Sequence, residues 1–393
     1  MKKQLLCTSA IALGVAAAPA AAQDWNLDWG GFFNTHVAIG DISVGNPALG
    51  AFDFEGDGVD VHITGEIIFT PSITLDNGLT FGINVQYEAQ NATNVDEAYA
   101  SISSDSFGRL DVGGENSAGY KLMTGAPSVT SMFINSPSTS AFIPFTGVDL
   151  GTGTTPTAAS SLTALPFRQA GLSSFIEVAG NNDVPRITYY TPDFNGLTVG
   201  VSYAPDGSTN AGSTFSINKN AVVSDIFDIG INYSGSFGTT DVTLAARWGT
   251  GDTQSVAVGA SDPEAWGVGA SITFGAVTVG GSYTENDNDE TIAGAGAPVA
   301  GDSEGWSFGV VYDAPGPWAF EALTYQSSTD RNIAGADTGL DIDREAYKIG
   351  ASRDLGPGVD WDIYLVYEER DDDSTAFTDV EGTVLGTAIN LSF

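Results

Sequence analysis

The sequence predicts an all-β protein, a 16-stranded antiparallel transmembrane β-barrel. Three observations lead to this fold class. Apolar and polar residues alternate over repeated segments of about ten residues, as they do in barrel strands. Short and long connections alternate between these segments, and this pattern favours a membrane barrel over a soluble sandwich. Aromatic residues such as Tyr87, Trp266 and Tyr367 stand near the segment ends, where the two membrane interfaces are expected.

The chain opens with a segment typical of a secretory signal peptide. Two lysines precede an apolar stretch over residues 5–18, and small residues follow up to Ala22. This pattern predicts cleavage after Ala22, so residues 1–22 are a cleaved signal peptide and residues 23–393 form the barrel. A retained anchor is disfavoured because a spanning helix needs about 20 apolar residues. Cys7 is the only cysteine, so the mature chain is predicted to have no disulfide and no cysteine-bound metal.

The chain is strongly acidic, with 49 Asp and Glu against 13 Lys and Arg. Two of these bases belong to the predicted signal peptide, which leaves 13 − 2 = 11 in the mature chain. So large an excess of acid argues against a nucleic acid partner. A disordered acidic chain is disfavoured as well, because 42% of the residues are hydrophobic and 10% are aromatic. After the signal peptide no apolar stretch reaches about 18 residues, which excludes helical membrane spans.

Alternation and turn residues together define the strands. Val61 and Ile63 share one face of the second strand, while Asp60 and His62 share the other. The Asn-Gly pair after this strand is the strongest short-range signal for a hairpin. An even number of strands allows the first and the last to close the barrel. The predicted strands are 26–39, 59–74, 79–90, 95–103, 108–115, 185–191, 197–204, 225–236, 241–249, 264–273, 277–285, 304–312, 317–328, 343–353, 359–370 and 382–393.

The long connections between hairpins are polar and alternate with tight turns. The third of them, residues 116–184, is far longer than a usual connection, which marks it as functional or disordered. The long connections are 41–57, 90–94, 116–184, 205–224, 250–263, 286–303, 329–342 and 371–381.

Several pieces of the chain resemble the Gram-negative general porins, particularly those of alphaproteobacteria. They are LDNGLTFGINVQYEA (75–89), VDEAYASISSDSFGRLDVGGEN (95–116), PRITYYTPDFNGLTVGVSYAPD (185–206) and the ending GTAINLSF. The resemblance implies a homotrimer in the outer membrane of a Gram-negative bacterium, in contact with outer-membrane lipid and lipopolysaccharide. It also implies short periplasmic turns, long extracellular loops and a long third loop folded into the lumen as a constriction. Acids on that loop would face arginines on the wall, although residues 116–184 are poorer in acids than this pattern.

Residues that alternate with the lipid-facing ones are expected to point into the lumen. The predicted pore-lining bases are Arg186, Arg247, Arg344, Lys348 and Arg370. The predicted pore-lining or constriction acids are Asp60, Glu66, Glu88, Glu97, Glu115, Asp149, Glu177, Asp228, Asp241 and Glu368. As rows or rings such charges set the field that selects ions. Each one taken alone is more often a solvated wall residue than a determinant of selectivity.

Two groups of residues could hold metal ions. His36 and His62 lie on the first two strands with lumen parity, which suits a divalent metal or a pH-sensitive patch. Acidic, glycine-rich loops suit calcium, because it takes six to eight oxygen ligands. For both groups hydrated side chains without a ligand are the favoured interpretation, so no cofactor is expected. The candidate calcium ligands are Asp53, Glu55, Asp57, Asp287, Asp289 and Glu290.

The predicted function is a water-filled channel for passive diffusion of ions and small hydrophilic solutes. Cations should be preferred, because loops of one sign around the mouth concentrate counter-ions. A substrate-selective channel on the same barrel is one alternative, and an outer-membrane barrel hydrolase is another. The hydrolase is disfavoured because the chain has two histidines and no recognisable nucleophile motif. We therefore expect no enzymatic activity.

Overall fold

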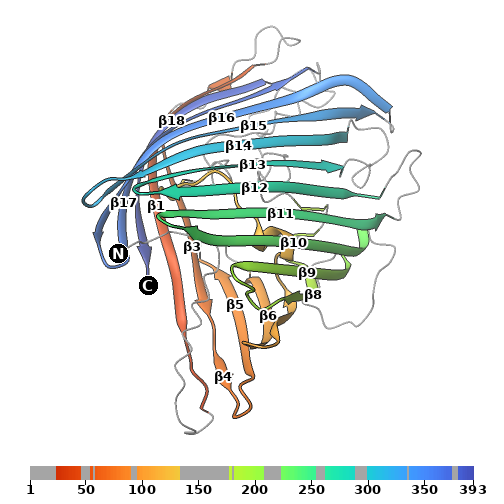
Figure 1. Cartoon of the computed structure of the whole chain (residues 1–393). Helices are drawn as coiled ribbons and strands as arrows, with labels where there is room; N and C mark the ends of the chain where they lie inside the picture. Colours follow the sequence, from red (N-terminus) through yellow and green to blue (C-terminus); the bar gives the residue numbers. More distant parts are fainter. Residues whose placement is uncertain are drawn as a thin grey trace.

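The computed structural model forms one closed antiparallel sheet (Figure 1). The predicted signal peptide, residues 1–22, lies outside the described residues. Among the described residues, no helix is long and apolar enough to cross a membrane. The described residues are 24–45, 54–55, 58–89, 95–132, 177–178, 181–207, 223–253, 262–287, 299–333, 336–373 and 379–393.

The sheet contains 18 described strand segments, which make up 16 strands of the barrel. The short β2 (Phe54–Glu55) pairs with the end of β1, and β4 (Ser72–Thr74) continues β3 along the same partner β5, so 18 − 2 = 16. The others are β1 (Trp29–Gly45), β3 (Gly58–Phe69), β5 (Thr80–Glu88), β6 (Val95–Ser104), β7 (Gly108–Gly114), β8 (Pro185–Tyr190), β9 (Leu197–Asp206), β10 (Val223–Phe237), β11 (Thr240–Thr253), β12 (Glu264–Phe274), β13 (Val277–Asp287), β14 (Val299–Asp313), β15 (Trp318–Ile333), β16 (Ala336–Gly356), β17 (Val359–Asp372) and β18 (Asp379–Ser392).

The first and last strands close the barrel. β1 pairs with β18 from Phe32 opposite Ser392 to Gly45 opposite Asp379, and with β3 on its other edge. The backbone N–H of Gly31 donates to the carbonyl of the terminal Phe393 at 3.1 Å, so pairing reaches the end of the chain. Every barrel strand therefore pairs with two neighbouring strands, so the sheet has no open edge within the hydrocarbon layer. The predicted 16-stranded antiparallel barrel is confirmed.

The strands have an apolar outer face and a polar inner face. Val37, Leu244 and Phe308 are 44–49% exposed on the outside, as lipid-facing side chains of a barrel are. Aromatic side chains contact one another at both ends of the strands. The ring centroids of Trp318 and Trp361 lie 5.8 Å apart near the tight turns. Those of Tyr347 and Tyr367 lie 6.4 Å apart toward the long loops.

Several strands continue further toward the long loops than the sequence predicts. β16 begins at Ala336, whereas the predicted strand begins at residue 343. The extra residues include Asp337, Asp341 and Ile342, which pair in register with β15 or β17. Four of the seven residues over 336–342 are Asp, Thr or Gly. The alternation that identifies a strand in the sequence is therefore weak there.

Candidate functional site

The segment of residues 115–132, here called the constriction segment, lies against the inner wall of the barrel. It leaves the end of β7 and begins with the short helix α1 (Ala118–Leu122), the one helix among the described residues. Ser117 caps this helix, since its Oγ accepts a hydrogen bond from the Tyr120 backbone N–H at 3.2 Å. The segment then runs extended to Met132. The described part of the third loop thus lies inside the barrel, as the resemblance implied.

Polar side chains of β9 and β10 hold the start of the constriction segment. The backbone N–H of Ala118 donates to Ser202 Oγ at 2.7 Å, and that of Gly119 donates to Asp228 Oδ1 at 2.7 Å. Asp228 also forms a buried ion pair with Arg247 of β11. One wall carboxylate therefore satisfies both a backbone donor of the loop and a neighbouring base.

A second attachment lies on β15 and β16. Glu321 accepts hydrogen bonds from the Val129 backbone N–H at 2.6 Å, from Thr130 Oγ1 at 2.6 Å and from Ser128 Oγ at 2.8 Å. Lys348 pairs with Glu321 at 2.9 Å and also donates to Ser128 Oγ and Thr130 Oγ1, both at 3.0 Å. The side chains of this pair are fully buried beneath the segment. A buried pair with all these additional hydrogen bonds fixes geometry.

Asp362 of β17 provides a third attachment. It accepts hydrogen bonds from the backbone N–H and the Oγ of Ser131, at 2.7 and 3.0 Å, and from Asn390 Nδ2 at 2.6 Å. Among the described residues, carboxylates of the wall thus accept hydrogen bonds from the loop. The family pattern implied loop acids that face wall arginines, and these hydrogen bonds add attachments of the opposite kind, from wall acids to loop donors.

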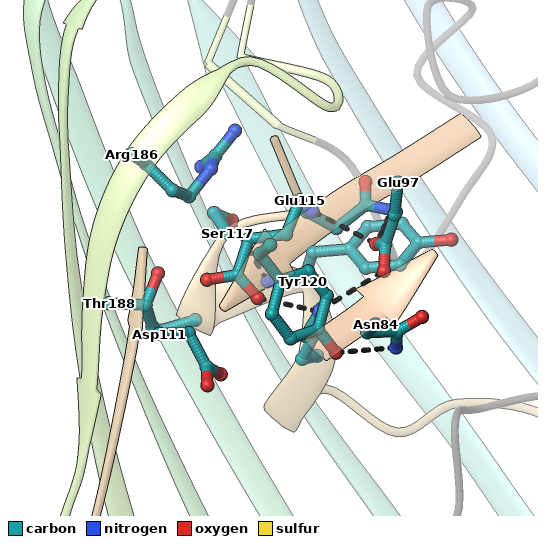
Figure 2. A network of polar contacts seen from close by, with 12 residues as sticks. Asn84, Glu97, Asp111, Glu115, Ser117, Tyr120, Arg186 and Thr188 are labelled. Carbon is teal, nitrogen blue, oxygen red and sulfur yellow. Dashed lines mark hydrogen bonds and ion pairs between the residues drawn. The ribbon is translucent and has the colours of Figure 1, made fainter. Parts of the chain in front are cut away.

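A network of charges surrounds the place where the segment leaves the wall (Figure 2). Lys121 pairs with Glu115 at 2.7 Å and with Glu97 at 3.4 Å. Glu97 also accepts from the backbone N–H and the Nδ2 of Asn116, at 3.1 and 2.9 Å, and from Gln86 Nε2 at 2.8 Å. Burial disfavours the charge on Lys121, but Glu115 and Glu97 outweigh it and hold the pKa of Lys121 above its usual range.

The five predicted pore-lining bases point inward but are buried, which corrects their predicted place at the lumen surface. Arg186 donates to the carbonyl of Val184 at 3.3 Å, and Arg344 donates to Thr329 Oγ1 at 3.2 Å. The constriction segment and wall side chains cover Arg247 and Lys348, so these charges face partners and not open water. The exposed fractions are 2% for Arg186 and Lys348 and 4% for Arg247, Arg344 and Arg370.

The predicted acids differ in their exposure and in their place in the barrel. Glu97, Glu115, Glu177, Asp228 and Glu368 are buried. Asp60 is exposed, and Glu66 and Glu88 are half-buried on the inner faces of β3 and β5. Asp241 lies by the tight turn after β10 and accepts from Ser236 Oγ at 2.6 Å. Asp149 lies outside the described residues.

Asp60, Glu66 and Glu88 lie on what we call the acidic wall, the inner face of β1, β3, β5 and β6. Glu66 stands directly opposite Glu88 across β3 and β5, and Glu97 lies within electrostatic range of Glu66. These four strands contain no lysine and no arginine. Two carboxyl groups thus lie side by side on this face of the lumen, and like charges placed directly opposite each other repel.

His36 and His62 are brought together as their strand positions predicted. They stand directly opposite each other on β1 and β3, with ring centroids 5.9 Å apart. His36 Nδ1 lies 3.1 Å from the hydroxyl of Tyr364. Among the described residues no three His, Cys, Asp or Glu side chains are grouped so that they could hold a metal ion. A metal at the two histidines stays a prediction.

The candidate calcium loops are largely outside the description. Asp53, Asp57, Asp289 and Glu290 are not among the described residues. Glu55 lies in β2, and Asp287 is the last residue of β13, in register with Glu264. Calcium binding at these loops also stays a prediction.

The sequence reasoning missed Glu321, Asp362 and Lys121, which make the attachments described above. For Glu321 a signal was present, because it is the one charged residue in the run WAFEALTYQSST over residues 318–329. A single inward charge in an otherwise uncharged run is a candidate for a specific partner. That partner is the constriction segment, which the strand pattern alone does not place.

The comparisons with known proteins agree with this architecture. A model of the Gram-negative porin family matches residues 8–375. None of the curated proteins matches the sequence. The anion-selective porin from Comamonas acidovorans has 18% identity and a TM-score of 0.55, over 94% of this chain and 100% of that chain. The outer membrane protein OmpT of Vibrio cholerae in its trimer form has 13% identity and a TM-score of 0.57, over 94% and 99%. Salmonella typhi OmpF in complex with daunomycin has 15% identity and a TM-score of 0.56, over 94% and 97%.

At these identities the likeness establishes the fold. The match to the family over most of the chain goes further: the chain belongs to the Gram-negative porin family and forms a channel in the outer membrane.

Proposed function

We propose that the chain is a cation-preferring porin through which ions and small hydrophilic solutes diffuse passively. The acidic wall carries this proposal, because Asp60, Glu66 and Glu88 face the lumen on strands that have neither lysine nor arginine. A surface of one sign concentrates counter-ions within a Debye length, about 8–10 Å at physiological salt. Membership of a porin family favours this function over the barrel hydrolase that the sequence left open.

Two of the bases on the other strands add little to an opposing field. Arg247 is paired with Asp228, and Lys348 is paired with Glu321, so both charges are balanced locally. The whole chain carries a formal net charge of −36. The Comamonas porin, described as anion-selective, shares the fold at 18% identity. We infer that selectivity in this family depends on which charges face the lumen, and here they are carboxylates.

The reversal potential across a KCl gradient in a planar bilayer tests the cation preference. We expect the sign that reports potassium as the more permeant ion, and we expect the preference to weaken at high salt because screening shortens the reach of the wall charges. A sign that reports chloride as the more permeant ion would contradict the proposal.

We propose further that the porin is a homotrimer surrounded by outer-membrane lipid and lipopolysaccharide. The apolar outer face supports this, since self-association covers part of it, and the Vibrio OmpT structure is described as a trimer. Chemical crosslinking of the native protein in mild detergent should give a ladder that ends at three subunits. A single monomer band under conditions that crosslink a known trimeric porin would count against the assembly.

A further inference from the structure

The strands beneath the constriction segment carry glycines that face inward where the segment crosses them. In Figure 1 the strands β10 to β15 run side by side, and the segment passes over their inner faces. We propose that these glycines form a seat that lets the constriction segment lie flush against the wall, and that they thereby set the width of the channel. They are Gly200, Gly230, Gly269, Gly280, Gly309 and Gly350.

The glycines follow the segment in order. A Cβ at Gly230 on β10 would lie 2.6 Å from the carbonyl oxygen of Ala118. On β13, a Cβ at Gly280 would lie 2.9 Å from the carbonyl oxygen of Gly125. Along the chain the contacts advance with the strands, and a Cβ at Gly350 on β16 would lie 2.8 Å from Thr130 Cγ2.

Two further glycines lie beneath the middle of the constriction segment. A Cβ at Gly269 on β12 would overlap the carbonyl oxygen of Thr124. At Gly309 on β14 it would lie 3.2 Å from both the Pro127 carbonyl oxygen and the Ala126 Cβ. Ordinary contacts between carbon atoms are about 3.5–4.0 Å. A side chain at Gly269 therefore requires the segment to move toward the pore axis, whereas one at Gly309 requires only a small shift of the segment and of Leu323, whose Cβ lies 3.0 Å away.

Glycine inside a strand is unfavourable, since it loses more backbone entropy on folding than other residues and adds no side chain to pack. None of these six positions has the positive φ that would itself favour glycine. A close backbone approach is the other reason for glycine in a strand. Here the approaching backbone is the constriction segment, and its closeness allows Asp228 and Glu321 to reach the N–H groups of Gly119 and Val129.

The seat has a direct effect on transport. A segment held flush against β9 to β16 occupies the least cross-section that its backbone allows. An added methyl group at Gly230 or Gly269 must push the segment inward by roughly an ångström to restore van der Waals contact, and one at Gly309 by less. Conductance follows the open cross-section, so these glycines act as positioning residues for the channel.

Single-channel conductance of Gly230→Ala and Gly269→Ala tests the proposal. We expect a fall of roughly 1.5-fold for each, because the displaced backbone narrows the lumen, and a larger fall for Gly269→Val. The matched control is Gly40→Ala on β1. It replaces a glycine away from the segment, where a Cβ would make ordinary contacts of 3.6 Å with Ile42 and Val384. Its conductance should equal that of the wild type.

Folding is checked for every variant by the β-sheet circular dichroism signal and the mobility shift on heating in gel electrophoresis. If Gly269→Ala does not fold, Gly309→Ala gives the milder test, since its contacts of 3.0–3.2 Å need only a small shift. Folded Gly230→Ala, Gly269→Ala and Gly309→Ala channels with wild-type conductance would overturn the proposal. The reversal potential of these variants should keep its sign, so the test is independent of the cation preference.

Discussion

Replacement of Lys348 by methionine should release the constriction segment and lower the thermal stability of the barrel. Methionine is an unbranched side chain only one heavy atom shorter than lysine, and it removes the charge that pairs with Glu321. A buried carboxylate left without its partner costs about 3–5 kcal/mol. The same substitution removes the hydrogen bonds from Lys348 to Ser128 and Thr130. We expect a lower melting temperature together with larger and noisier single-channel currents.

The double variant Lys348→Met/Glu321→Leu separates the two effects. It removes both charges of the buried pair, which is often nearly neutral for stability. We expect it to regain much of the melting temperature lost in Lys348→Met. The currents should stay noisy, because Glu321 also accepts from Val129 and Thr130 and these contacts are lost as well. If Lys348→Met kept both the wild-type melting temperature and quiet currents, the ion pair would not be what holds the segment.

The sequence was sufficient for the barrel because lipid imposes one rule on every strand. Side chains on one face must be apolar, and period-two alternation shows this residue by residue. The pairing of His36 with His62 followed from the same rule, since both strands and their connecting loop could be located. Strand ends beyond the apolar band, as at Ala336, were missed because no such rule applies there.

The site was predicted less well because parity tells which way a side chain points and not what covers it. Arg247 and Lys348 do point inward, but the constriction segment and the neighbouring Asp228 and Glu321 bury them. The path of the segment depends on contacts between residues about 100 to 230 positions apart, such as Gly119 with Asp228 and Ser131 with Asp362. The inward glycines are visible in the sequence, yet what they face is not.

The acidic wall yields the prediction with the largest effect on transport. Glu66→Lys/Glu88→Lys should invert the ion preference of the channel. The two positions are direct cross-strand neighbours on the inner face, and the substitutions change the formal charge there by up to four units. A unit charge about 8 Å from the ion path in water contributes about 0.2 kcal/mol after screening at physiological salt. Because the change acts in opposite directions on potassium and chloride, their permeability ratio should change roughly tenfold.

A matched control exists on the outer face of the same barrel. Glu345 and Glu369 are also directly opposite each other, on β16 and β17, but they lie on the outer face, where each accepts a hydrogen bond from a tyrosine at 2.8 Å. Glu345→Lys/Glu369→Lys therefore makes the same change in net charge with the sheet between the new lysines and the ions. Its reversal potential should stay close to that of the wild type. If both double variants shifted the reversal potential equally, net charge and not the acidic wall would set the selectivity, and if neither shifted it, the narrowest part of the pore would lie away from β3 and β5.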